Sequence, residues 1–248
     1  MNKNKTSLKA GAVLEFKFDE LPNTLYGLKK GKRITSRLLA CLPKNYTRDS
    51  LFPVLVYIAG GDGGSINREN LNYVRKLTAD KDFIAVALPL FKKDLDPEEM
   101  FKGVLIGAYD DLPMISKCYR KMLKTLFDAV LNIDAKRSLF GGFSNGAHTT
   151  AMLVSAVDPF IMKHFSGFYL LDGGCYITSG HKIVVRKKRF IQFVGGSRRY
   201  KWRRHLLDFV DANHAMGWQP DVTIVKMPGV EHAFPDEYIP QLRKWFNE

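Results

Sequence analysis

The clearest chemical signal in the sequence is a serine flanked by glycines, in the segment Gly142-Phe143-Ser144-Asn145-Gly146. An apolar, β-like run ends at this segment, and a run of small residues typical of a helix follows it. A G-x-S-x-G turn from strand to helix holds the serine oxygen at the helix N-terminus, where the first amides and the helix dipole favour negative charge. The pattern therefore predicts a nucleophilic serine, and a glycine-rich turn that contains a serine by chance is the alternative.

A nucleophilic serine needs a base, and His232 is the best placed of the six histidines. It lies in the segment 227–235, just after the last β-like run, where a loop side chain can reach Ser144 across the strand ends. His148 is four residues after Ser144 on the expected helix, so we expect it to pack rather than to act as the base.

A second glycine-rich loop follows the apolar run Val54 to Ile58 and reads Ala59-Gly60-Gly61-Asp62-Gly63-Gly64. Its backbone N–H groups can turn toward one point and, paired with the amide that follows the serine, would form an oxyanion hole. A phosphate-binding loop is the alternative. No Lys-Ser or Lys-Thr follows the glycines, however, and the G-x-G-x-x-G spacing is missing.

The elements that must position these residues alternate along the chain as short β-rich runs and stretches of helical period. This alternation predicts an α/β fold with a mostly parallel, eight-stranded sheet and helices on both faces. One domain is expected over residues 1–248, because this length is near the upper limit for a single core. The expected strands are Ala12 to Phe18, Ile34 to Leu42, Val54 to Ile58, Phe83 to Leu88, Ser138 to Gly141, Ser166 to Leu171, Phe190 to Val194 and Val222 to Lys226.

The first two strands, joined by a connection rich in Pro, Gly and Lys, are expected to enter the sheet antiparallel to each other. Apolar residues recur at steps of three and four from Leu112 to Val130 and predict a helix, which starts at Asp110 or Asp111. The same rule predicts helices around 202–210 and over 238–246, the second entered at Pro235.

Composition excludes several classes of protein. The 17 Phe, 10 Tyr and 3 Trp exclude a disordered chain, and the longest apolar runs are far shorter than the roughly 20 residues of a membrane-spanning helix. No export signal is recognisable, so we expect a cytoplasmic protein, or a secreted one whose signal has been removed. Three cysteines without C-x-x-C spacing suggest neither a disulfide framework nor a metal site, and we expect no cofactor.

The sequence resembles the α/β-hydrolase superfamily and, within it, the serine esterases grouped with polyhydroxybutyrate depolymerases and feruloyl esterases. The resemblance runs from about Val54 to the end and is carried by the AGGDGG loop, by GGFSNGA and by PGVEHAFP, in that order. It implies that Ser144 is the nucleophile and His232 the general base. The same resemblance assigns the oxyanion hole to the amides of Gly61 and Asn145.

Two features depart from that family. Ala59 stands where such enzymes commonly carry a histidine, which removes a side chain but no donating amide. The acid usually follows the seventh strand, yet residues 195–204 contain no carboxylate. A known variation places the acid after the sixth strand, where this chain has Asp172. Asp172 is therefore the candidate acid, and a turn-forming aspartate or a dyad without an acid are the alternatives.

The 38 Lys and Arg exceed the 25 Asp and Glu by 13 charges, which favours anionic partners. Arg198 and Arg199, after the seventh strand, are expected at the rim of the site, where guanidinium groups can bind an anionic ester such as that of an acidic sugar. A solvated helix face is the alternative. The segment 182–204 holds ten basic residues and no acidic one: Lys182, Arg186, Lys187, Lys188, Arg189, Arg198, Arg199, Lys201, Arg203 and Arg204.

We therefore expect a serine carboxylic-ester hydrolase that acts on a small-molecule or carbohydrate ester, without a metal. A hydrolase-fold binding protein with an impaired site is the first alternative. The second is a nucleic-acid binder that uses the basic segment with its interleaved aromatic residues Phe190, Phe193, Tyr200 and Trp202. Residues 91–108 are expected to form either a lid over the site or a solvated connection.

Overall fold

A computed structural model of the chain describes residues 8–21, 35–60, 68–91, 112–173, 188–196 and 222–248. Eight strands form one sheet across these residues, in the order β1-β2-β4-β3-β5-β6-β7-β8. The strands are β1 (Val13–Phe18), β2 (Ser36–Cys41), β3 (Val54–Ile58), β4 (Ile84–Leu88), β5 (Leu139–Phe143), β6 (Gly167–Leu171), β7 (Arg189–Gly195) and β8 (Val222–Met227).

Strand direction divides the sheet into two parts. β1 pairs antiparallel with β2, and β2 pairs antiparallel with β4. From β4 through β3, β5, β6 and β7 to β8 every neighbouring pair is parallel. The carboxyl ends of β3, β5, β6, β7 and β8 therefore meet at one edge of the sheet, which is where parallel sheets bind ligands.

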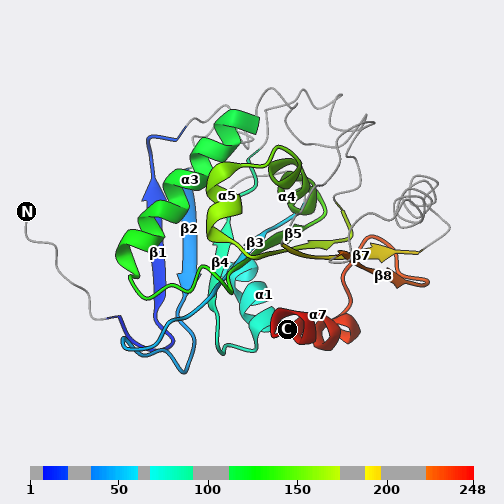
Figure 1. The fold of residues 1–248 in the computed structure, drawn as a ribbon, viewed down its shortest axis with the longest axis horizontal. Coiled ribbons are helices and arrows are strands. Elements are labelled where there is room, and N and C mark those ends of the chain that lie inside the picture. The colour runs from blue at the N-terminus through cyan, green and yellow to red at the C-terminus, as the bar shows by residue number, and fades with distance from the viewer. Residues whose placement is uncertain (1–7, 22–34, 61–67, 92–111, 174–187, 197–221) are drawn as a thin grey trace, which may run out of the picture.

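Helices cover both faces of the sheet (Figure 1). On one face lie α3 (Leu112–Ala129), α4 (Asn145–Ser155) and α5 (Pro159–His164), and on the other lie α1 (Arg68–Thr78) and α7 (Ile239–Phe246), the second preceded by the short helix η4 (Asp236–Tyr238). β3, β4 and β6 are buried along their whole length because both of their faces are covered. None of the described helices is long and apolar enough to cross a bilayer.

The mostly parallel, eight-stranded sheet with helices on both faces is as the sequence predicts, including the antiparallel entry. Some strand boundaries differ from the predicted ones. The most informative difference is at β5, which begins at Leu139 rather than at Ser138. The Ser138 hydroxyl accepts a hydrogen bond from the Val54 N–H at 2.9 Å and donates one to the Asp134 carbonyl at 2.7 Å. Ser138 thus joins the starts of β3 and β5 instead of extending the strand.

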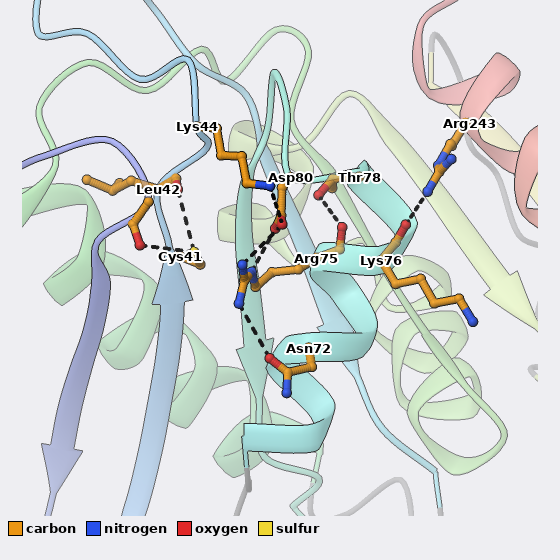
Figure 2. A network of polar contacts seen from close by, with 10 residues as sticks. Cys41, Leu42, Lys44, Asn72, Arg75, Lys76, Thr78, Asp80 and Arg243 are labelled. Carbon is orange, nitrogen blue, oxygen red and sulfur yellow. Dashed lines mark hydrogen bonds and ion pairs between the residues drawn. The ribbon is translucent and has the colours of Figure 1, made fainter.

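A polar network fixes the C-terminal end of α1 (Figure 2). Arg75 donates from Nε to Asp80 Oδ1 at 2.7 Å and from Nη2 to Asp80 Oδ2 at 3.1 Å, and Lys44 lies 3.6 Å from the same carboxylate. Arg243 of α7 donates to the carbonyls of Lys76 and Leu77. Both carbonyls lie in the last turn of α1, where helix carbonyls lack their usual partners, so a guanidinium there binds them and suits the helix dipole. The network therefore joins α1 to α7.

We predict that Asp80→Asn lowers the free energy of unfolding by about 1 kcal/mol at pH 7, because it removes a partly buried, two-point ion pair. Hydrogen bonds from Arg75 lower the pKa of the Asp80 carboxyl. The ion pair therefore stabilises the fold above the pKa of about 4 of an unfolded aspartate, and its contribution is lost as the pH falls through the lower folded value. Urea unfolding of both proteins from pH 7 to pH 3 should show the difference shrinking.

Asp82→Asn is the matched control. Asp82 has the same left-handed backbone conformation, with φ 60° against 57° for Asp80, but its carboxylate accepts from the Asn45 amide rather than from a guanidinium. An equal, pH-independent loss in both variants would contradict the assignment to the ion pair.

Candidate active site

Ser144 lies at the sharp turn between β5 and α4, with φ 52° and ψ −117°. This backbone conformation is rare for a residue with a side chain and costs of order 1–3 kcal/mol, so the surroundings must hold it in place. They do so through the Ser144 N–H, which donates to the Leu171 carbonyl of β6 at 3.0 Å, and the Ser144 carbonyl, which accepts from the His148 N–H at 3.0 Å.

The glycines on either side of the turn allow it to approach β3. A Cβ on Gly142 would lie 2.4 Å from the Ile58 carbonyl oxygen, and a Cβ on Gly146 would lie 2.0 Å from the same atom. Only glycine fits at either position, because the obstructing atom belongs to the backbone of a buried strand. The close approach brings the Ser144 turn beside the loop that follows β3.

His232 lies in the loop after β8, and its imidazole bridges two side chains. Its Nε2 is 2.7 Å from Ser144 Oγ, and its Nδ1 is 2.6 Å from Asp172 Oδ2. The side chain is 38% exposed, whereas that of Asp172 is 0% exposed. A carboxylate can only accept, so Nδ1 carries the proton that is donated to Asp172, and Nε2 is left to accept from the Ser144 hydroxyl.

Asp172 directly follows β6, at a bend of the chain with φ 43°, and its carboxylate faces His232. Its N–H donates to the Phe193 carbonyl at 2.8 Å, and its Oδ1 accepts from the Gly195 N–H at 2.9 Å. Gly195 ends β7. The carboxylate thus reaches from the end of β6 to the end of β7 and contacts the histidine that follows β8.

The residues expected to form an oxyanion hole are only partly within the described structure. Asn145 opens α4, so its backbone amide lies at the helix N-terminus next to Ser144. Gly61 lies outside the described residues, and Gly60 is the last described residue of its loop. A Cβ on Gly60 would come 2.7 Å from Ser144 Cβ and 3.0 Å from Phe143 Cδ1, so this loop begins in close contact with the serine turn.

The structure places two further residues, Phe143 and His148, near His232. The ring of Phe143 stacks on that of His232, with centroids 5.0 Å apart and planes 25° apart. The position of Phe143 directly before Ser144 is the only sequence signal for this contact.

His148 is buried, as expected for a packing residue, and burial lowers its pKa to about 4, helped by the electrostatic effect of His232.

Several residues singled out from the sequence lie outside the described part of the chain. They include Arg198 and Arg199, most of the basic segment, the expected helix at 202–210 and residues 92–108 of the lid or connection. Phe91, at the start of that connection, is buried against Tyr119. Phe190 and Phe193 are also buried, so neither offers a ring for stacking on a base.

Within the described ranges, no group of His, Cys, Asp and Glu could hold a metal ion.

Comparison with solved structures shows the α/β-hydrolase fold. Fluorophosphonate-binding serine hydrolase F of Staphylococcus aureus matches with a TM-score of 0.60 and 13% identity, over 96% of this chain and 99% of that one. An S-formylglutathione hydrolase from Agrobacterium tumefaciens matches with a TM-score of 0.56 and 13% identity, over 98% and 94%. Esterase 2 of Thermogutta terrifontis gives 0.54 and 15%, over 92% of each chain. No protein-family model and no curated protein sequence matches the chain.

The burial of His148 leads to a prediction about acid stability. Its pKa of about 4 lies below the value of about 6.5 in the unfolded chain, so below pH 6.5 the unfolded state binds a proton that the folded state does not. Folding stability should therefore fall as the pH drops from 6.5 to 4, by roughly 3 kcal/mol from this group alone. His148→Gln should lack this loss.

The measurement is the free energy of unfolding in urea for both proteins at pH 7 and at pH 4. The difference between them should move in favour of His148→Gln on acidification. His164→Gln is the control, because His164 is only half-buried and lies on α5. A parallel acid response of wild type and His148→Gln would contradict the prediction.

Proposed function

We propose that the protein is a serine carboxylic-ester hydrolase in which Ser144 is the nucleophile, His232 the general base and Asp172 the acid. The observation that carries the proposal is the continuous chain of contacts from Ser144 Oγ to His232 Nε2 at 2.7 Å, and from His232 Nδ1 to Asp172 Oδ2 at 2.6 Å. The three side chains come from the ends of β5, β6 and β8, so the sheet holds them in place.

In the first half of the reaction, Ser144 Oγ attacks the carbonyl carbon of the ester while its proton passes to His232 Nε2. The carbonyl π electrons move to the oxygen, and the amide of Asn145, with that of Gly61, stabilises the resulting oxyanion. The buried Asp172 carboxylate favours the imidazolium through its contact with Nδ1. Collapse of the intermediate expels the alkoxide, which takes the proton from Nε2 and leaves an acyl-serine.

In the second half, water replaces the alcohol. His232 Nε2 takes a proton from the water as its oxygen attacks the acyl carbon, and the same proton then returns to Ser144 Oγ as the acid departs. The 38% exposure of the His232 side chain supports this step, because water can reach the base.

The matching solved structures support a hydrolase of this kind without specifying its substrate. One structure of the Thermogutta esterase is described as butyrate-bound. We infer a small-molecule or carbohydrate ester as the substrate here, and place the chain with the esterases related to polyhydroxybutyrate depolymerases and feruloyl esterases on the motifs of its sequence. The contact of Asp172 with His232 argues against a binding protein with an impaired site, and the burial of Phe190 and Phe193 argues against a nucleic-acid binder.

The proposal predicts strongly non-additive losses in the turnover of a short p-nitrophenyl ester. Ser144→Ala and His232→Ala should each lower turnover by on the order of a million-fold, and the double variant by little more. Asp172→Asn should lower it by on the order of 10⁴, because the histidine loses the group that orients it. A fluorophosphonate probe should add its mass to wild type but not to Ser144→Ala.

Asp158→Asn is the matched control for Asp172→Asn. Asp158 is also buried, but it caps α5 by accepting from the N–H groups of Phe160 and Ile161. This variant should lose stability and keep its turnover. Near-native turnover in any of the Ser144, His232 or Asp172 variants would refute the assignment of that residue.

We further propose that Arg198 and Arg199 favour esters on an anionic molecule, such as an acidic sugar. Support comes from the ten basic residues and no acidic one in 182–204 and from the ability of guanidinium groups to bind carboxylates at two points. For matched neutral and anionic esters, kcat/KM at low salt should favour the anionic one, and changing both arginines to alanine should remove the preference. Equal kcat/KM values in wild type would refute the preference.

A further inference from the structure

The ring of Phe143 covers one face of the imidazole on which the proposed reaction depends. The two ring centroids are 5.0 Å apart and the planes are within 25° of parallel. The edges of the same imidazole are held by Ser144 at Nε2 and by Asp172 at Nδ1. Hydrogen bonds at two edges of the imidazole lie in the plane of the ring, so they do little to prevent the ring from tilting about the line that joins them. A contact on the face of the ring therefore adds a constraint that the hydrogen bonds do not supply.

Phe143 is itself held in place from two sides. It ends β5, where its backbone pairs with Leu171 of β6, and its half-buried side chain packs against the hydrophobic core. On the side of β3 it lies so close to Gly60 that a Cβ there would come 3.0 Å from Phe143 Cδ1 and 3.1 Å from the Phe143 carbonyl oxygen. The ring therefore lies at the paired end of β5, beside the loop that follows β3.

The stacked arrangement affects the two charge states of His232 differently. The face of an aromatic ring carries partial negative charge and attracts a cation within about 6 Å of its centroid, whereas a neutral imidazole gains only packing. Among the described residues, the other ionisable groups near the ring are Asp172 after β6, His148 on α4 and Glu231 in the same loop. Asp172 is buried and contacts Nδ1 at the edge of the imidazole, whereas Phe143 covers its face. Both residues therefore favour the imidazolium.

We propose that Phe143 is a positioning residue for His232, which fixes the plane of the imidazole and stabilises the imidazolium formed as Ser144 is acylated and deacylated. The proposal rests on the function proposed above. Because the imidazolium forms after the ester has bound, Phe143 acts mainly on kcat and little on KM.

The test compares three variants. Phe143→Leu removes the aromatic face with little change in volume, and Phe143→Tyr keeps it. Phe127→Leu is the control, since Phe127 on α3 is also half-buried and stacks on another ring, Phe160, at 6.1 Å and 17°. Thermal unfolding of each variant first measures how much stability it has lost.

For Phe143→Leu we expect kcat for a p-nitrophenyl ester to fall about fivefold with KM changed by less than about twofold. Phe143→Tyr and Phe127→Leu should match wild type in both kcat and KM. Wild-type kcat in Phe143→Leu, or the same loss of kcat in Phe127→Leu, would overturn the proposal.

The NMR chemical shifts of the His232 ring protons separate this proposal from the proposed function, because they need no turnover. In Phe143→Leu these protons should lose the ring-current shift of the stacked aromatic, whereas Phe143→Tyr should behave as wild type. Unchanged chemical shifts in Phe143→Leu overturn the role of Phe143 even in an active enzyme. A wild-type protein that neither turns over esters nor reacts with a fluorophosphonate overturns the function, whatever the chemical shifts show.

Discussion

The candidate site depends on one buried carboxylate. Asp172 has no solvent-exposed side-chain surface, and a buried charge is costly unless hydrogen bonds and an opposite charge compensate for it. The compensation comes from the Gly195 N–H at the end of β7 and from His232 after β8. Because Asp172 directly follows β6, its side chain links the ends of β6 and β7 to the loop after β8, and the histidine takes its orientation from this arrangement.

A second constraint acts from the opposite side of the serine. The turn between β5 and α4 packs directly on the Ile58 carbonyl of β3, which is possible only with glycine at positions 142 and 146. This packing holds Ser144 in a rare backbone conformation and aims its oxygen at His232. The strained backbone of Ser144 and the burial of the Asp172 carboxylate both lower stability. The packing of the sheet, whose central strands are buried on both faces, offsets this loss.

Stabilising polar contacts lie at the other end of the molecule as well. Arg75 and Asp80 fix the end of α1, and Arg243 joins that end to α7. Lys76 of α1 also lies near Asp236 of η4, so the helix pair is tied at several points. These contacts stabilise the C-terminal segment that follows the His232 loop. None of them involves the side chains of Ser144, Asp172 or His232.

The sequence by itself determined the features that are local. Alternating periodicity gave the strands and their mostly parallel arrangement, the G-x-S-x-G turn located Ser144, and the position of His232 after the last strand placed it at the same edge of the sheet. Each depends on neighbouring residues and on the geometry common to parallel sheets.

Tertiary structure decided what depends on strands that are distant in sequence. From the sequence alone Asp172 could also be a turn residue, and only the order β6-β7-β8 in the sheet brings its carboxylate to Gly195 and His232. The stacking of Phe143 on His232 was likewise invisible, because 89 positions separate the two residues and no local pattern records the contact. Local periodicity encodes which face of an element is buried, whereas the partner that it meets there is set by the fold.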